Sequence, residues 1–279
     1  MLRMVSMKEN LNGYTYPETT KFKCLFNGIA IPLLSMVVGA ALAAIVLLIS
    51  GVSIEVLQEY IKTKDSIKIL IIQNIVVIAI LLPLYLKEKK YRPEPIMKIS
   101  GIEYFIYGVM VLASLFMLTD ALKQVFISLT GSNMEQHYKE VTSAMLDAPK
   151  LLPKLIAIGL LAPVAEELIF RGIMLDRLSS KFNKYVAIVI SSVLFGLIHG
   201  NLSQFIAATI GGFGMGYFYM LTGSLMLTII THIVNNVIAV LEPYILEVIP
   251  YAALQVFWAV LFAFGIFYFC KARKKAANA

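Results

Sequence analysis

The hydrophobic residues of this chain occur in long runs that short polar segments separate. An α-helix needs about 20 apolar residues to cross the ~30 Å hydrocarbon layer of a membrane, and each run has roughly that length. The runs predict transmembrane helices at residues 26–50, 68–86, 103–119, 152–175, 184–202, 203–222, 224–243 and 250–270. The predicted fold is therefore all-α, a polytopic membrane protein with a bundle of about eight transmembrane helices.

The composition agrees with a protein that lies mostly in lipid. Hydrophobic residues make up 59% of the chain and charged residues 15%, against about 45–50% and about 25% in soluble domains. The net charge of +7 does not indicate a nucleic-acid partner, because the basic residues stand beside the apolar runs, where they orient membrane proteins. The chain is therefore predicted to consist of three parts: an N-terminal segment (1–25), a transmembrane domain (26–270) and a basic tail (271–279).

The distribution of basic residues predicts the orientation of the chain. An even number of crossings places both termini on one side of the membrane. Most of the 24 Lys and Arg residues then lie in segments on that side, whereas the last segment on the opposite side, 242–251, carries only acidic charge. Because cytoplasmic loops are rich in Lys and Arg, we expect an integral, multi-pass protein of the plasma membrane with a cytoplasmic N-terminus and C-terminus.

One apolar run contains three charged residues, in the sequence LAPVAEELIFRG at 161–172. An ionisable side chain at the centre of a transmembrane helix costs at least ~2.5–3.5 kcal/mol on insertion scales. Glu167 and Arg171 are four residues apart, in the favourable order for an ion pair on one helix face. Glu166 points in a different direction and has no partner in its own helix, which makes it a candidate general base.

Two histidines and an amide in later apolar runs are candidates to meet Glu166. His199 follows Phe195 by one helical turn, so the imidazole and the aromatic ring share a face. Asn236 follows His232 at the same spacing. Polar groups at membrane depth usually line a cavity or the interior of a bundle, where they are functional.

These residues suit the hydrolysis of a carbonyl compound. Glu166 with His199 can deprotonate a water molecule. His232 and Asn236 can donate hydrogen bonds to the oxyanion, and such a donor contributes roughly 2.7–4 kcal/mol in a dry site. A zinc site built from Glu166, His199 and His232 is an alternative, since two histidines and a carboxylate form a known catalytic ligand set. The sequence contains no serine elbow and no HExxH motif.

Three short motifs resemble those of a known family. EELIFR (166–171), FGLIH (195–199) and HIVNN (232–236) are similar to the EExxxR, FxxxH and HxxxN motifs of the CAAX prenyl endopeptidase and bacteriocin-processing (CPBP, or Abi) family of intramembrane proteases. The matching catalytic core runs from about residue 150 to about residue 240. The resemblance implies an eight-helix fold and hydrolysis of peptide bonds within the membrane.

The resemblance also implies roles for the motif residues. Glu166 and His199 would activate water, and His232 and Asn236 would form the oxyanion hole. Glu167, Arg171 and Phe195 would support them. The implied enzyme is a glutamate-type endopeptidase that needs no cofactor, and the zinc-dependent version is the alternative.

The implied partners are the lipid bilayer and a membrane-delivered peptide or protein substrate. Some bacterial members are bacteriocin immunity proteins or partners of membrane sensor kinases, so the resemblance extends to a sensor kinase or a peptide-export system. A non-catalytic immunity or regulatory protein is therefore the second candidate function, and a prenylated CAAX substrate is not implied. A proton-coupled transporter is less favoured, because no paired repeat of broken helices is present.

Overall fold

The structure, a computed structural model, describes residues 13, 14, 16, 20–57, 66–95, 151–200 and 202–277, and the single positions 106, 108, 110, 125 and 128. Within these residues every regular element is a helix, and 5 of the helices are long and apolar enough to cross a membrane. The prediction of an all-α polytopic membrane protein is confirmed. The predicted span 103–119 lies outside the described residues, apart from three positions in it.

The long helices are α1 (Lys21–Ile49), α3 (Ser66–Glu88), α9 (Lys184–Leu197), α10 (Leu202–Thr222), α11 (Leu225–Leu246) and α12 (Tyr251–Ala277). A single 3-10 turn, η1 (Lys89–Tyr91), continues α3. Between α3 and α9 lies a continuous helix, which consists of α6 (Leu151–Lys154), η2 (Leu155–Leu161), α7 (Ala162–Glu167), η3 (Leu168–Leu175) and α8 (Asp176–Ser179). We call residues 151–179 the motif helix, and its η2 and η3 segments are π-helical.

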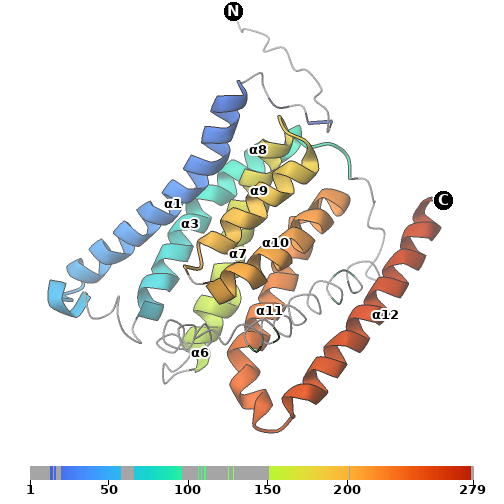
Figure 1. Cartoon of the computed structure of the whole chain (residues 1–279). Helices are drawn as coiled ribbons and strands as arrows, with labels where there is room; N and C mark the ends of the chain where they lie inside the picture. The colour runs from blue at the N-terminus through green and yellow to red at the C-terminus, as the bar shows by residue number, and fades with distance from the viewer. Residues whose placement is uncertain are drawn as a thin grey trace, which may run out of the picture.

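The motif helix lies at the centre of the bundle. Every residue of η3 is buried, and a core cluster joins its apolar side chains to α3, α9 and α10. In Figure 1, α1 and α3 lie to one side of the motif helix, while α9 and α10 lie in front of it. A helix that is apolar on all sides must be surrounded by other helices or by lipid, and here the neighbouring helices surround the segment that carries the charges.

Helix α9 ends earlier than the predicted span 184–202. The N–H groups of His199 and Gly200 bond to carbonyls three residues back, which tightens the last turn. Gly200 then takes a φ of +71°, the left-handed conformation that commonly ends helices. His199 therefore lies in the turn that follows α9 and not inside the helix.

Basic residues gather at one end of the bundle. In Figure 1, α1 begins and α3 and α12 end on the side where α8 lies. This side holds Lys21, Lys23, Lys87, Lys89, Lys90, Arg92 and Arg177. The predicted orientation requires such a cluster, and the assignment of this side to the cytoplasm stays a prediction. Helix α12 continues to Ala277, so most of the predicted tail 271–279 is helical.

Candidate active site

Glu167 and Arg171 form an ion pair within the motif helix, as their spacing predicts. Nη1 of Arg171 lies 2.7 Å from Oε1 of Glu167, and the two side chains are 1% and 0% exposed. Nη2 of Arg171 also donates to the carbonyl oxygen of Gly212 in α10, over 3.1 Å. A side chain at Gly212 would place its Cβ 3.0 Å from the Phe195 ring and 3.3 Å from this Nη2. The absence of a side chain therefore lets α10 approach the arginine closely.

His232 of α11 contacts both glutamates of the EExxxR motif. Its Nδ1 lies 3.0 Å from Oε1 of Glu167, and its Nε2 lies 3.6 Å from Oε2 of Glu166. An ionised carboxylate only accepts hydrogen bonds, so Nδ1 carries a proton and donates it to Glu167. The 3.6 Å separation of Nε2 from the Glu166 carboxylate is longer than a hydrogen bond, so the two groups form an ion pair only when the imidazole is protonated.

The two adjacent glutamates differ in their access to solvent. The Glu166 side chain is 19% exposed, whereas the Glu167 side chain is 0% exposed. Only Glu166 can therefore contact a water molecule from outside the packed core. Glu167 is instead committed to Arg171 and His232.

Phe195 of α9 contacts both histidines. The centroid of its ring is 5.1 Å from that of His199 and 5.6 Å from that of His232, and both imidazoles stand perpendicular to it. Arg171 lies over the same ring, with Cζ 4.6 Å from the centroid. Such contacts favour a fixed ring orientation. The predicted neighbourhood of Phe195 and His199 is thus observed.

The imidazole of His199 has a defined hydrogen-bond partner on its Nδ1 side. Nδ1 lies 2.8 Å from the carbonyl oxygen of Phe195. Because a carbonyl only accepts, Nδ1 carries the proton, and in the neutral ring the lone pair resides on Nε2. A ring in this tautomer can accept a proton at Nε2.

Asn236 bonds to the motif helix itself. Its Nδ2 donates to the carbonyl oxygen of Ile158 in η2, over 2.9 Å. A side-chain amide has two N–H donors, so this bond leaves the second one for another acceptor. The sequence pairs Asn236 with His232 on one face of α11, but it does not indicate this anchor.

Glu166, His199 and His232, the residues proposed for a zinc site, do not form a group of metal ligands in the structure. Glu166 and His232 approach each other, and His199 contacts the ring of Phe195. Among the residues that the structure describes, no three or more His, Cys, Asp or Glu side chains are grouped so that they could hold a metal ion. We therefore derive no catalytic step through zinc.

Two side chains among the described residues bind carbonyls of η3, and the motifs do not reveal them. Ser191 of α9 donates to the carbonyl oxygen of Phe170, over 2.9 Å. Arg92 donates to the carbonyl oxygen of Gly172, over 3.4 Å. A serine in an apolar run is a weak signal for such a bond, and for Arg92 the sequence offers none.

Comparison with known proteins shows that this region is similar to a known family. A family model described as "Type II CAAX prenyl endopeptidase Rce1-like" matches residues 148–238, which contain all three motifs. The resemblance to the CPBP family is confirmed. The matched segment contains the motif helix, α9, α10 and most of α11, and therefore every candidate site residue.

One relative adds to this assignment. A protein of Bacillus subtilis (strain 168), named "Putative membrane peptidase YdiL", is 36% identical over 108 residues, which is 37% of this chain and 44% of that protein. The chain thus matches less than half of the length of this relative. No solved structure matches the chain.

Proposed function

We propose that this protein is an intramembrane endopeptidase that cleaves a membrane-delivered peptide or protein with a glutamate-activated water molecule. The observation that supports the proposal most is the position of Glu166. It is the exposed member of the two adjacent glutamates, and its carboxylate faces Nε2 of His232 at 3.6 Å. This pair lies in the segment that matches a family of endopeptidases.

The proposed reaction begins with water beside Glu166. The carboxylate takes a proton from the water, with Nε2 of His199 as a second acceptor, and the resulting hydroxide attacks the carbonyl carbon of the substrate. A new C–O bond forms while the π electrons of the carbonyl move to its oxygen. The proton then passes to the leaving nitrogen as the C–N bond breaks. General bases of this kind contribute about 10²–10⁴-fold to a rate.

His232 and Asn236 would stabilise the oxyanion. In the imidazolium form, His232 donates from Nδ1 to Glu167 and has a second donor at Nε2 for the oxyanion. The second N–H of the Asn236 amide would supply another donor. Pre-aimed donors of this kind are worth about 2.7–4 kcal/mol each in a dry site. Glu167 contributes by fixing the imidazole and by stabilising its positive charge.

The decisive test compares the N-terminal peptides of cell membranes that contain either the wild type or Glu166→Gln. We expect new N-termini that depend on the wild-type protein and are absent with Glu166→Gln, because glutamine has the same shape but cannot accept the proton of water. The measurement is mass spectrometry after chemical labelling of free α-amines. Glu88→Gln, which removes a carboxylate that pairs with Arg177 outside the three motifs, is the control and should give the wild-type set of termini.

Identical sets of N-termini for the wild type and Glu166→Gln would reject the proposal. If cells with Glu166→Gln also keep the protective or signalling effect of the protein, a non-catalytic immunity or regulatory role takes its place. The same data identify the natural substrate and the cleaved bond when the proposal holds. A synthetic, internally quenched peptide that spans this bond then serves for kinetics.

We further propose that the reaction needs no metal. We expect purified protein to keep its rate on the quenched peptide after incubation with 1,10-phenanthroline, because Glu166 and the two imidazoles provide the proton acceptors and donors themselves. A soluble zinc protease in the same buffer is the control and should lose its activity. Loss of cleavage that added zinc restores would instead support the zinc-dependent alternative.

A further inference from the structure

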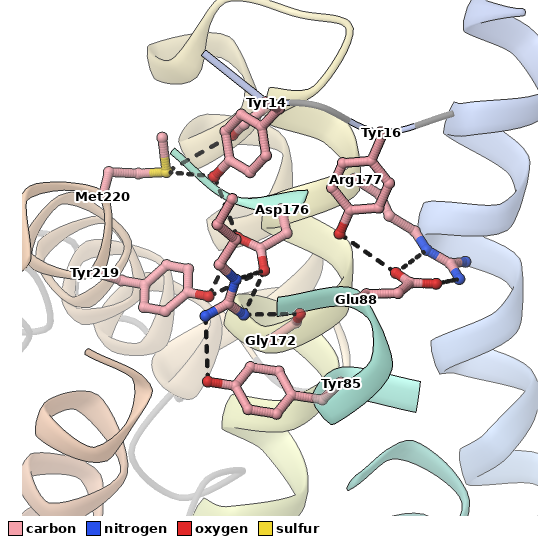
Figure 2. A network of polar contacts seen from close by, with 11 residues as sticks. Tyr14, Tyr16, Tyr85, Glu88, Gly172, Asp176, Arg177, Tyr219 and Met220 are labelled. Carbon is pink, nitrogen blue, oxygen red and sulfur yellow. Dashed lines mark hydrogen bonds and ion pairs between the residues drawn. The ribbon is translucent and has the colours of Figure 1, made fainter. Parts of the chain in front are cut away.

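A second polar cluster surrounds Asp176, the first residue of α8, about ten residues beyond the paired glutamates. The Asp176 side chain is 1% exposed and forms an ion pair with Arg92. The hydroxyls of Tyr14 and Tyr219 donate to its carboxylate over 3.2 Å and 3.0 Å. Figure 2 shows Tyr14 of the N-terminal segment and Tyr219 of α10 pointing toward Asp176, and Arg92 follows η1 in the chain. Burial raises the pKa of Tyr14 well above its ordinary value, so its hydroxyl stays protonated and able to donate.

Arg92 connects this cluster to the π-helical segment η3. Besides Asp176, its guanidinium donates to the hydroxyl of Tyr85, over 3.2 Å, and to the carbonyl oxygen of Gly172, over 3.4 Å. Its Cζ lies 4.5 Å from the centre of the Tyr85 ring. A side chain at Gly172 would place its Cβ 3.0 Å from that ring. Tyr85 of α3 and Arg92 therefore both contact the backbone of η3.

The two π-helical segments lie on either side of the turn that carries Glu166 and Glu167. α7, which contains Glu166, lies between η2 and η3. π-helical turns are rare and occur mostly at functional sites, and a wider turn rotates the residues beyond it relative to an α-helix. Each segment has a carbonyl that a side chain from another part of the chain binds, Ile158 in η2 and Gly172 in η3. These bonds fix the backbone on both sides of the glutamates.

Stability alone does not account for the buried pair of Arg92 and Asp176. The cost of removing two charges from water can exceed their mutual attraction, and apolar residues of similar size are often equally stable or more so. A fully satisfied polar network does, however, specify a single arrangement of the elements that it joins. Here the joined elements are the motif helix, α10 and the segment that follows α3.

We propose that Arg92 and Asp176 are positioning residues for catalysis, which hold η3 so that the Glu166 carboxylate faces His232. The inference rests on the proposed endopeptidase function. Gly172 is six residues from Glu166 in the same continuous helix, so a displacement of η3 also displaces the Glu166 carboxylate. A misplacement of about 1 Å can cost on the order of 10²-fold in rate.

The test uses purified full-length protein and the internally quenched peptide from the membrane experiment. We expect Arg92→Lys and Asp176→Asn to lower kcat about 10- to 100-fold and to change KM less than about threefold, because they disturb the reacting groups more than substrate contacts. Lysine keeps the charge but cannot reach Asp176, Tyr85 and Gly172 together. Thermal unfolding in detergent is measured on the same samples.

A neighbouring ion pair provides the matched control. Arg177, the next residue of α8, pairs with Glu88 of α3 at 2.6 Å, with side chains 12% and 13% exposed. The Arg177 guanidinium also donates to the carbonyl of Asn27 in α1, and among the described residues this side chain makes no hydrogen bond to η3. Glu88→Gln should therefore lower the unfolding temperature but keep kcat within about threefold of the wild type.

Unchanged kcat in Arg92→Lys and Asp176→Asn would overturn the positioning role, whatever their unfolding temperature. If both variants fail to fold, the double variant Arg92→Met/Asp176→Leu takes their place, because it removes both charges together and also the bond to Gly172, and a wild-type kcat there overturns the role equally. Glu166→Gln runs in parallel. Full cleavage by that variant rejects the endopeptidase function itself, whereas its inactivity together with fully active Arg92 and Asp176 variants rejects only the positioning role.

Discussion

Replacement of Glu166 by glutamine is expected to lower kcat on the quenched peptide by at least about 100-fold, because a positioned general base contributes about 10²–10⁴-fold. The side chain is 19% exposed and faces Nε2 of His232. Glutamine fills the same volume and still forms hydrogen bonds, so the packing around the site should persist. The measurement is the initial rate of the purified variant against substrate concentration.

Glu166→Asp distinguishes the loss of the base from its displacement. Aspartate keeps the carboxylate but withdraws it by one methylene, so we expect an intermediate loss, about 10- to 100-fold. The unfolding temperature of both variants should match that of the wild type. A rate for Glu166→Gln above one-tenth of the wild-type value, outside the expected range for a general base, would contradict the assignment of Glu166 as the base.

The features that the sequence predicts well are those that depend on local spacing. The long apolar runs predict the membrane helices, and the spacing of four residues between Glu167 and Arg171 predicts an ion pair that the structure confirms. Both follow from the geometry of a single helix. The family motifs also predict which helices contribute residues to the same site. The family match over residues 148–238 contains all three motifs.

The features that the sequence does not predict depend on other helices. Apolar spacing cannot reveal the π-helical segments, because their carbonyls are bound by Asn236 and Arg92 from distant parts of the chain. The bond between Glu167 and His232 joins residues 65 positions apart, and helix geometry alone assigns Glu167 only to Arg171. His199 lies beyond α9 because the left-handed Gly200 ends the helix, a boundary that hydrophobicity does not mark.

The buried ion pair of Glu167 and Arg171 should contribute separately to the stability of the fold and to catalysis. Glu167→Leu leaves the Arg171 guanidinium buried with only the Gly212 carbonyl as a described hydrogen-bond acceptor. Breaking a buried pair in this manner costs about 3–5 kcal/mol, because one charge remains uncompensated. We expect a loss of that size in the free energy of unfolding, measured by titration with sodium dodecyl sulfate in mixed micelles.

The double variant Glu167→Leu/Arg171→Met separates stability from catalysis. Replacement of both charges by apolar groups of similar volume is often neutral, so we expect most of the lost unfolding free energy to return. Activity should stay at least about tenfold below the wild type, since the Nδ1 proton of His232 then lacks the acceptor that orients the ring. If the double variant regained full activity, Glu167 would serve only to neutralise Arg171, and the imidazole of His232 would hold its place through Phe195 and the packing of α11 alone.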